Sequence, residues 1–493
     1  QLTKQIYLHL DTTAQSGKRL AECKTWHKLN MEVLQRTANR GSISDGGYEV
    51  ENSCKFEADN SESMARTNAS EGNKQICTLS MWVKRTELAD SFFFTAGDNA
   101  DPFFLFGFYQ DKIYWTTTAG VSAGGVMQTN RVFRDTSAWY HIILAIDTTQ
   151  GTDTNRYKLY VNGIQETSFK TANYPSQNDN LKIMDDVPQD VGGYTSYFLS
   201  GYLAEFVAID GQALAPTEFG EFDADSGIWK PIDVSGLTFG TNGFYLDFKD
   251  SANLGNDASG GLDFTETNIS AADQATDTPT NNFAIGNVLT GKEGFLVTTE
   301  GATKGVLSTA GPGNNTGGVS LISTIPVSRG KWYFEAQNTN AGDVYLYLGV
   351  GDTGSINLWG IEGVTLTAQT SSSVGWRGGG SNDGKGYGRS AGTNYTSTNP
   401  VTWETEVVGL ALDLDNGVMY FRKSGTYINS GDPAGGTDNG GQYDLVTGVD
   451  NQWCIAVSAY NLATWHINFG GYTTMSISSA ASDANGYGTF EYA

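Results

Sequence analysis

Short apolar runs, each bounded by turn-forming residues, follow one another along most of this chain. Strand-like runs include TLSMWVKR (78–85), DPFFLFGFYQ (101–110), DKIYWTTT (111–118) and AWYHIILAIDTT (138–149). The segment NRYKLYVNGIQETSF (155–169) alternates apolar and polar residues on both sides of Asn162-Gly163. An Asn-Gly pair supplies the two positive-φ positions of a type I′ turn, so this segment is predicted to be a β-hairpin. The succession of runs favours an all-β fold.

The composition agrees with strands joined by tight turns. Among the 493 residues there are 61 Gly and 10 Pro, and 12% of the chain is aromatic. Glycine favours turns, whereas aromatic side chains favour strands and are scarce in disordered segments. A chain of this length is long enough for several domains, each with its own core.

Charge and hydropathy exclude two classes of partner. The formal net charge is −24, and such an acidic surface repels a phosphate backbone, so we expect no nucleic-acid partner. Apolar runs such as WYHIILAI (139–146) are far shorter than a bilayer span, so we expect a soluble chain with no membrane insertion. The cysteines at 23, 54, 77 and 454 lack zinc-site spacing, and a Cys54–Cys77 disulfide and free thiols both stay open.

Residues 1–45 differ from the rest and are predicted to hold a helix over residues 17–41. Apolar residues recur there at every third or fourth position, as on one face of a helix. The stripe consists of Leu20, Cys23, Trp26, Leu29 (or Asn30) and Leu34. The segment is also locally basic. It is predicted to dock on a partner or mediate assembly, or alternatively to pack on its own next domain.

The remaining chain divides into two strand-rich globular units, over 46–230 and 286–493. The segment between them, 231–285, is rich in Gly, Asn, Asp and Thr and is predicted to be a connector with one or two strands. In the second unit, a hairpin is predicted with Asn416-Gly417 at its turn.

Several motifs resemble known domain families. MWVKRTELADSFFFTAG (81–97), the run from Trp139 to Thr167 and SGYLAEFVAIDGQAL (200–214) together resemble laminin-G-like, concanavalin-type jelly rolls. GKWYFEA (330–336), LGVGD (348–352), the run 407–425 and INFGG (467–471) resemble the SPRY domain. The resemblances imply two antiparallel β-sandwich domains in series after a short N-terminal helical segment. The ending at 485–493 resembles chains that run on, so the second domain is expected to be cut short.

The connector motif TPTNNFA (278–284) is similar to one that recurs in structural proteins of marine tailed bacteriophages. The resemblance implies a non-enzymatic virion protein at the particle exterior, of the tail-fibre or receptor-binding type. It implies a host surface glycan or receptor as ligand, a homotrimer, and attachment to other virion proteins through the N-terminal segment. Two alternatives stay open, namely a capsid or head decoration protein and a polysaccharide depolymerase of glucanase-like fold.

The depolymerase alternative depends on GEFDADSG (220–227). Glucanases of this fold place catalytic carboxylates at alternate positions of one strand. Glu221, Asp223 and Asp225 have this spacing, but the third acid comes one residue early and the run reads as a loop. A solvated acidic turn is the structural alternative, and we predict no catalytic residues. His141 and His466 lie in apolar runs, where a histidine is usually structural.

A structural Ca²⁺ is compatible with the laminin-G resemblance, and acidic loops such as GDNADP (97–102) offer oxygens for it. The runs DADSG (223–227) and DLDNG (413–417) lack the closing Glu of an EF-type loop. No metal ligand is assigned, and no other cofactor is expected.

The predicted ligand-binding site is the Gly-rich segment 371–398. SPRY domains, which this half resembles, recognise partners through loops at one end of the sandwich. Trp376 and Tyr387 are expected to stack on a sugar, and polar groups beside them would bond its hydroxyls. These polar residues are Arg377, Asp383 and Arg389. The alternative is that Trp376 belongs to a strand and packs inward.

One acid interrupts the apolar run at 200–214. Strict alternation places Tyr202, Ala204, Phe206 and Ala208 on one face and Leu203, Glu205, Val207 and Ile209 on the other. Both faces are then largely apolar, as expected of a strand that is covered on both sides. Glu205 must therefore be paired or lie near a strand end, because an unpaired buried carboxylate is costly.

Overall fold

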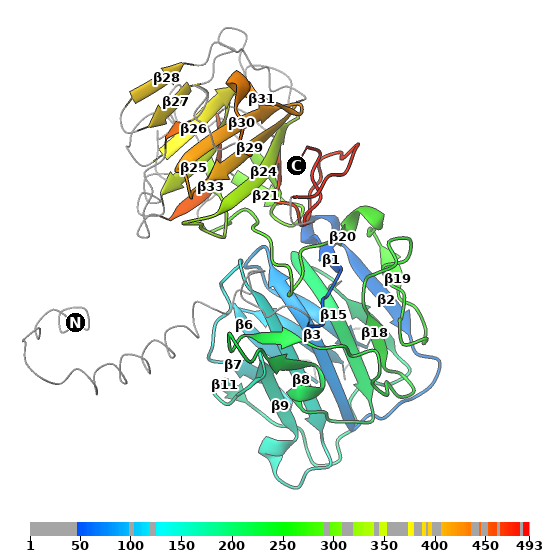
Figure 1. Cartoon of the computed structure of the whole chain (residues 1–493). Helices are drawn as coiled ribbons and strands as arrows, with labels where there is room; N and C mark the ends of the chain where they lie inside the picture. Colours follow the sequence, from blue (N-terminus) through cyan, green and yellow to red (C-terminus); the bar gives the residue numbers. More distant parts are fainter. Residues whose placement is uncertain are drawn as a thin grey trace, which may run out of the picture.

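The computed structural model describes a chain of antiparallel strands joined by turns and short 3-10 helices (Figure 1). The described residues are 47–97, 103–117, 125–289, 296–307, 319–339, 345–352, 373–378, 387–390, 393–396, 406–434, 443–444, 452–460, 464–483 and 487–492. The all-β prediction is confirmed, whereas the helix predicted over 17–41 lies outside these residues. In the described part of the chain, no helix has the length and apolarity needed to cross a bilayer.

The first sandwich, over the first half of the chain, consists of two eight-stranded sheets. One sheet has the order β10-β9-β8-β3-β15-β1-β20, with β18 also pairing with β15. Its strands are β1 (Ser53–Phe56), β3 (Ile76–Arg85), β8 (Trp139–Asp147), β9 (Tyr157–Val161), β10 (Ile164–Glu166), β15 (Gly201–Asp210), β18 (Phe244–Leu246) and β20 (Gln274–Ala275). We call this the first sheet. Asn162 and Gly163 have φ of 50° and 76°, so the predicted positive-φ turn joins β9 to β10.

The second sheet has the order β11-β7-β6-β5-β4-β12-β2-β19. Its strands are β2 (Ser63–Thr67), β4 (Ser91–Ala96), β5 (Phe104–Tyr109), β6 (Lys112–Thr116), β7 (Met127–Thr129), β11 (Phe169–Ala172), β12 (Pro188–Val191) and β19 (Thr265–Thr267). The two sheets enclose an aromatic core in which Phe93 meets Phe106 and Phe108 edge to face. The strand-like runs predicted at 78–85, 101–110, 111–118 and 138–149 all contain strands.

The segment predicted as a connector is largely part of the first sandwich. Three short strands within 231–285, β18, β19 and β20, extend its two sheets. The prediction of one or two strands was too low, because strands of two or three residues are too short to show periodicity in a sequence. Before them, β16 (Gly220–Phe222) and β17 (Trp229–Pro231) form a separate hairpin, which follows a short 3-10 helix at Pro216–Glu218.

The second half of the chain forms further antiparallel sheets around its own core. One sheet has the order β21-β22-β34-β24-β29-β30-β31 with β32 on β30, the next has β23-β33-β25-β26, and β27 pairs with β28. The strands are β21 (Leu296–Thr299), β22 (Lys304–Leu307), β23 (Val319–Ile322), β24 (Lys331–Asn338), β25 (Tyr345–Asp352), β26 (Ser373–Gly378), β27 (Tyr387–Ser390), β28 (Thr393–Thr396), β29 (Val407–Asp413), β30 (Val418–Lys423), β31 (Thr426–Tyr427), β32 (Tyr443–Asp444), β33 (Trp453–Tyr460) and β34 (Thr464–Asn468). Phe334, Leu348 and Leu410 are fully buried between them.

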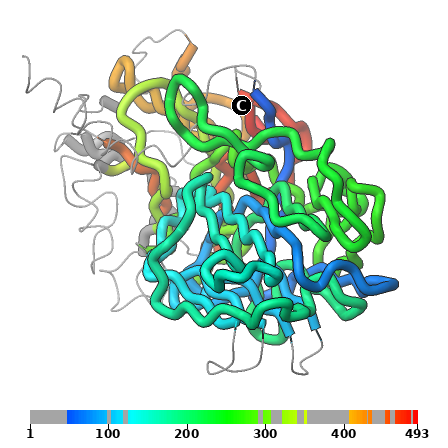
Figure 2. Tube along the Cα trace, turned by 90° about the horizontal axis from the view of Figure 1, so that it is seen from below, coloured from blue at the N-terminus to red at the C-terminus, as the bar shows by residue number. Residues whose placement is uncertain are grey.

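The outer face of the first sheet is covered partly by the second half of the chain and partly by residues 214–245. Trp82, Trp139 and Tyr202 point away from the main core into an apolar cluster that also contains residues of the second half. Tyr202 meets the ring of Tyr472 at 6.0 Å between centroids. Figures 1 and 2 both show the C-terminal segment, in red, beside the first described strands, in blue. Ile285 and Ala302 complete this apolar cluster.

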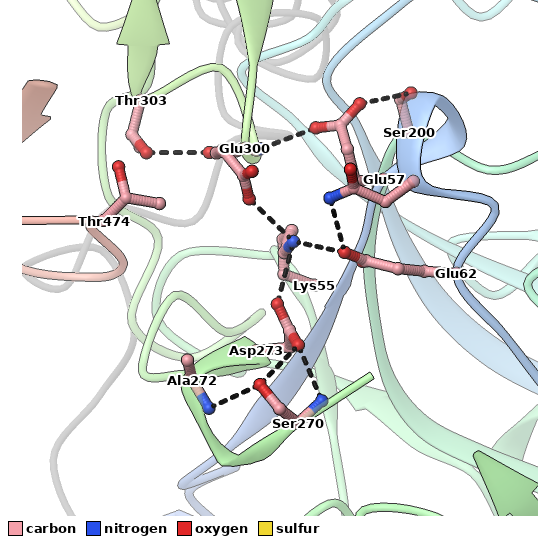
Figure 3. A network of polar contacts seen from close by, with 12 residues as sticks. Lys55, Glu57, Glu62, Ser200, Ser270, Ala272, Asp273, Glu300, Thr303 and Thr474 are labelled. Carbon is pink, nitrogen blue, oxygen red and sulfur yellow. Dashed lines mark hydrogen bonds and ion pairs between the residues drawn. The ribbon is translucent and has the colours of Figure 1, made fainter. Parts of the chain in front are cut away.

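A buried ion network fixes one contact between the two halves (Figure 3). The Nζ of Lys55 lies 2.9 Å from Glu62, 2.8 Å from Asp273 and 3.0 Å from Glu300. Glu300 begins a turn in which it, Gly301 and Ala302 all have positive φ, from 55° to 65°. The backbone of Gly301 donates to Glu57 and accepts from the Tyr202 hydroxyl, at 3.3 and 3.1 Å. This left-handed turn of the second half is therefore held by buried polar side chains of the first half.

A second lysine holds the connector motif TPTNNFA. Lys84, which is completely buried, donates to Asp277 at 2.6 Å, to Asn282 at 2.8 Å and to the carbonyl of Phe283 at 2.7 Å. The indole of Trp139 donates to the other oxygen of Asp277 at 2.9 Å. A buried ammonium needs such partners, since removing one member of a buried ion pair costs about 3–5 kcal/mol. The motif at 278–284 thus has a structural role, because it is bound to the outer face of the first sheet.

Strand β15 contains a bulge at Glu205, and this changes the predicted faces. The pairing with β3 shifts by one residue between Ala204 and Val207, and Glu205 has φ of 47°. One extra residue reverses the alternation beyond it. Leu203, Phe206 and Ala208 consequently face the main core, while Tyr202, Ala204, Val207 and Ile209 face outward. The strict alternation predicted for this run was therefore wrong beyond the bulge, although both faces are apolar as expected.

Gly107 allows the second sheet to close around a bulge in β4. A Cβ at Gly107 would lie 2.0 Å from the carbonyl oxygen of Ser91 and 2.6 Å from the Cα of Phe92, both backbone atoms that cannot move aside. We expect Gly107→Ala to lower the free energy of unfolding by about 1–3 kcal/mol or more, the usual cost of overpacking. Urea denaturation measures this loss.

Gly151→Ala is the matched control, because nothing lies within 4 Å of a Cβ at that exposed turn. It should change stability by less than about 0.5 kcal/mol. Equal stability of the two variants would contradict the close backbone approach at Gly107.

Candidate functional site

The acids of 220–227 form ion pairs with a lysine and hydrogen bonds within their own turn. Glu221 stands on β16, and its carboxylate lies 3.3 Å from Lys230, which also pairs with Asp223 at 3.4 Å. The other oxygen of Asp223 accepts from the Ser226 amide and hydroxyl and from the Asp225 amide. Catalysis by a retaining glycosidase needs two carboxylates held across one sugar bond. These contacts instead match the structural alternative of an acidic turn, although Glu221 lies on a strand and not on a loop.

Glu205 is paired, as the sequence required. Only 5% of the residue is exposed, and its Oε2 accepts from the hydroxyls of Tyr245 at 2.8 Å and Tyr48 at 3.2 Å. Burial raises the pKa of this carboxyl to about 7. The bulge turns Glu205 toward these tyrosines, and its contacts do not include Glu221 or Asp223. It therefore acts as a structural acid on the outer face of the first sheet.

His141 and Ser80 resemble a nucleophilic pair but cannot work as one. The Nε2 of His141 lies 2.8 Å from the Ser80 hydroxyl, and the Trp229 indole donates to Nδ1 at 2.8 Å. Because Nδ1 accepts this bond, the ring proton sits on Nε2, which then cannot take the serine proton. The ring is buried and stacks on Trp82 at 4.5 Å between centroids. This confirms the structural interpretation of His141.

Cysteines and acids give no assigned metal site among the described residues. Cys54, Cys77 and Cys454 are buried and form no disulfide with one another, so Cys54 and Cys77 do not pair. Oxygens of Glu71, Asp185 and Asp186 lie within 4.8 Å of one another, but Lys182 already lies 2.6 Å from Asp185. Residues 98–102 of the acidic loop at 97–102 lie outside the described residues. A structural Ca²⁺ stays a prediction.

The predicted ligand residues of 371–398 are only partly placed. Trp376 and Arg377 occupy successive positions of β26, paired with Leu348 and Tyr347 of β25. Leu348 is fully buried in the second core. Both alternatives for Trp376, stacking on a sugar and packing inward, stay open. Tyr387 and Arg389 lie at alternate positions of β27, whereas Asp383 lies outside the described residues. Their binding role stays a prediction.

The outward face of the second sheet is the better-defined candidate surface. On β5, Phe104, Phe106 and Phe108 point into the core, so Leu105, Gly107 and Tyr109 face outward. A row across five strands shares that face. In register it consists of Thr116, Leu105, Thr95, Asp190 and Ala65. Thr95 donates to Asp190 at 3.2 Å, and burial raises the pKa of this half-buried acid.

Two tyrosines form the aromatic part of this face. Tyr109, 37% exposed, and the half-buried Tyr114 lie 5.4 Å apart between ring centroids. Tyr114 pairs in register with Gln128 on one side and with Gly107 on the other, so no side chain from β5 covers it there. Burial raises the pKa of Tyr114, which keeps its hydroxyl protonated as a donor.

This arrangement is suited to binding a polyhydroxylated ring. Aromatic rings with polar tips, held on the strands of a face that also contains a half-buried carboxylate, provide both a stacking surface and hydrogen-bond partners. Sequence reasoning did not identify the face, although the alternation in FLFGFY (104–109) and KIYWT (112–116) carries the signal. The predicted ligand-binding site was the glycine-rich segment 371–398 instead.

Glu205→Gln tests the buried acid through pH. The carboxyl has an ordinary pKa of 4.5 and a folded pKa of about 7, so between these values only the unfolded chain ionises. Stability supplied by the protonated carboxyl is complete below pH 4.5 and is lost as pH rises through 7. Relative to Glu205→Gln, the wild type should lose up to about 3 kcal/mol of unfolding free energy between pH 4 and pH 8.

Urea denaturation across this pH range measures the difference, with Glu221→Gln as the exposed control. A wild type and Glu205→Gln variant whose stabilities run parallel with pH would contradict the buried, tyrosine-bound carboxyl.

Comparison with known proteins supports the first sandwich. Residues 59–218 match the family model described as the concanavalin A-like lectin/glucanases superfamily, which agrees with the predicted laminin-G-like jelly roll. That description spans both binding proteins and hydrolases, so it does not decide between them. The comparison with curated proteins gives no match.

Two solved structures are among those to which this chain is similar. A native heptameric SAP-like pentraxin from Limulus polyphemus is 13% identical with a TM-score of 0.27, and it covers 34% of this chain and 80% of its own. The TRIM65 PSpry domain is 14% identical with a TM-score of 0.23, and it covers 38% of this chain and 91% of its own.

Proposed function

We propose that this chain is a non-enzymatic glycan-binding protein, and that its first sandwich binds sugar on the outward face of the second sheet. The observation that carries the proposal is the half-exposed pair Tyr109 and Tyr114 on the outward face of a sheet that also contains the half-buried Asp190. The lectin part of the superfamily description agrees with it. Since the outer face of the first sheet is covered, the second sheet has the face that a ligand can reach.

Binding is favoured over hydrolysis because the candidate catalytic carboxylates are already paired with other side chains. Glu221 and Asp223 share Lys230, and Glu205 is closed in by tyrosines. A polysaccharide depolymerase is the second candidate, because the superfamily description includes glucanases. Release of reducing ends from host glycan, abolished by Glu221→Gln, would favour it and contradict the binding proposal.

We further propose that the protein is displayed on the exterior of a tailed-phage virion as a tail fibre or receptor-binding protein. The resemblance of TPTNNFA (278–284) to connectors in marine phage proteins supports this. In this proposal, the chain is a homotrimer and residues 1–45 attach it to other virion proteins. The capsid decoration alternative predicts high copy number on heads and no block of phage adsorption by the free protein.

Tyr114→Ala tests the proposed binding face. Losing the central aromatic of the face should weaken binding to host surface glycan by about tenfold or more, the usual effect of truncating an anchor residue. Glycan-array screening followed by calorimetry on the best oligosaccharide measures this. Trp332→Ala is the matched control, because Trp332 is a 44% exposed aromatic in the other half of the chain.

Glycan binding that survives Tyr114→Ala but falls with Trp376→Ala would move the site to the segment 371–398. Absence of glycan binding in the wild type would contradict the proposed function itself.

A further inference from the structure

A lysine stands next to the two tyrosines of the proposed binding face. Lys112 on β6 pairs in register with Tyr109 on β5 and comes two residues before Tyr114. Because residues two apart on a strand share a face, Lys112 lies on the outward side with both tyrosines. Side chains that oppose each other in an antiparallel pair have Cβ atoms about 4.5–5.5 Å apart. The ammonium of Lys112 is therefore carried at the edge of the tyrosine pair.

A second lysine reaches the same end of the sheet. Lys170 is exposed on β11, and its Nζ donates to the side-chain oxygen of Gln110, the residue after Tyr109, at 3.3 Å. The Nζ of Lys112 donates to the backbone carbonyl of Asn130, just beyond β7, at 2.7 Å. Strands β6, β7 and β11 are successive neighbours in the second sheet (Figure 1). Both ammonium groups thus contact neutral oxygens close to the turn between β5 and β6.

The acids around this turn are bound to other groups. Asp111 lies 3.3 Å from Arg85 and 2.7 Å from Arg134. Asp90 and Glu166 accept from backbone amides at 2.7 and 2.9 Å. Among the residues that the structure describes, no carboxylate lies within 4.0 Å of either lysine.

Lysines without a carboxylate partner are unusual in this acidic chain, which has 54 acidic and 30 basic residues. Most of the other described lysines lie within 4.0 Å of a carboxylate. Examples are Lys55, Lys74, Lys84, Lys182, Lys230 and Lys331. The charges of Lys112 and Lys170 are therefore left for an anion that comes from outside the chain.

We propose that the sugar bound at Tyr109 and Tyr114 is acidic, and that its sulfate ester or carboxylate contacts Lys112 and Lys170. The inference rests on the proposed glycan-binding function and names the class of glycan. A lysine ammonium is a compact point charge that forms strong hydrogen bonds with either kind of anion. The negative charge of the rest of the chain repels anions, so an acidic glycan needs local cations of this kind.

Glycan-array binding of the full chain tests the class of ligand. The array includes oligosaccharides of carrageenan, which carry sulfate, of polygalacturonate, which carry carboxylate, and of agarose, which carry neither. Binding to one of the acidic sets should exceed binding to the neutral set by about tenfold or more, and the preferred set identifies the anion. Equal or tighter binding to neutral glycans would overturn the acidic class and leave the proposed function standing. No binding to any glycan would contradict the proposed function.

The double variant Lys112→Gln/Lys170→Gln tests the two residues by calorimetry with the best acidic oligosaccharide. Losing two charge-assisted hydrogen bonds should weaken binding by about tenfold or more, whereas Lys112→Arg/Lys170→Arg, which keeps both charges, should bind more tightly than the Gln pair. Lys249→Gln is the matched control, because the side chain of Lys249 is 48% exposed elsewhere on the first sandwich. Unchanged binding by the Gln pair, with binding still reduced by Tyr114→Ala, would overturn the role of the lysines but not glycan binding on this face.

Discussion

Two buried lysines hold the outer face of the first sheet against the segments that follow it. Lys55 forms ion pairs with Glu62, Asp273 and Glu300. Lys84 forms an ion pair with Asp277 and hydrogen bonds with other residues of the connector. Each ammonium is fully buried, so neither can be left unpaired without a large loss of stability. The apolar cluster around Trp139 and Tyr202 fills the space between them. The connector is thus part of the fold and not a free linker.

The covered outer face of the first sheet limits where a ligand-binding site can lie. A β-sandwich offers two outward faces, and here one of them is occupied by residues 214–245 and by the second half of the chain. The same burial explains why the residues that first resemble catalytic groups have structural roles. Glu205, His141 and Asp223 all form hydrogen bonds on the covered side of the first sheet. The other outward face presents Tyr109 and Tyr114 on rigid strands, where ligand contacts need little ordering.

The parts of the fold that depend on local patterns could be predicted from the sequence. Asn162-Gly163 identified its hairpin, and long strands such as β3 and β8 showed as apolar runs. The bulge at Glu205 could not be predicted, because the cross-strand pairing with β3 decides where an extra residue is accommodated. The proposed binding face was missed for a similar reason. Thr95 and Asp190, which are 95 residues apart in the sequence, become neighbours only because β4 pairs with β12.

A crystal structure of the chain with a bound host oligosaccharide tests the central claim most directly. The account predicts a sugar ring on Tyr114, with hydroxyl contacts to the side chains of the row that contains Thr95 and Asp190. A sugar bound only at residues 373–396, or in contact with Glu221 and Asp223, would contradict it.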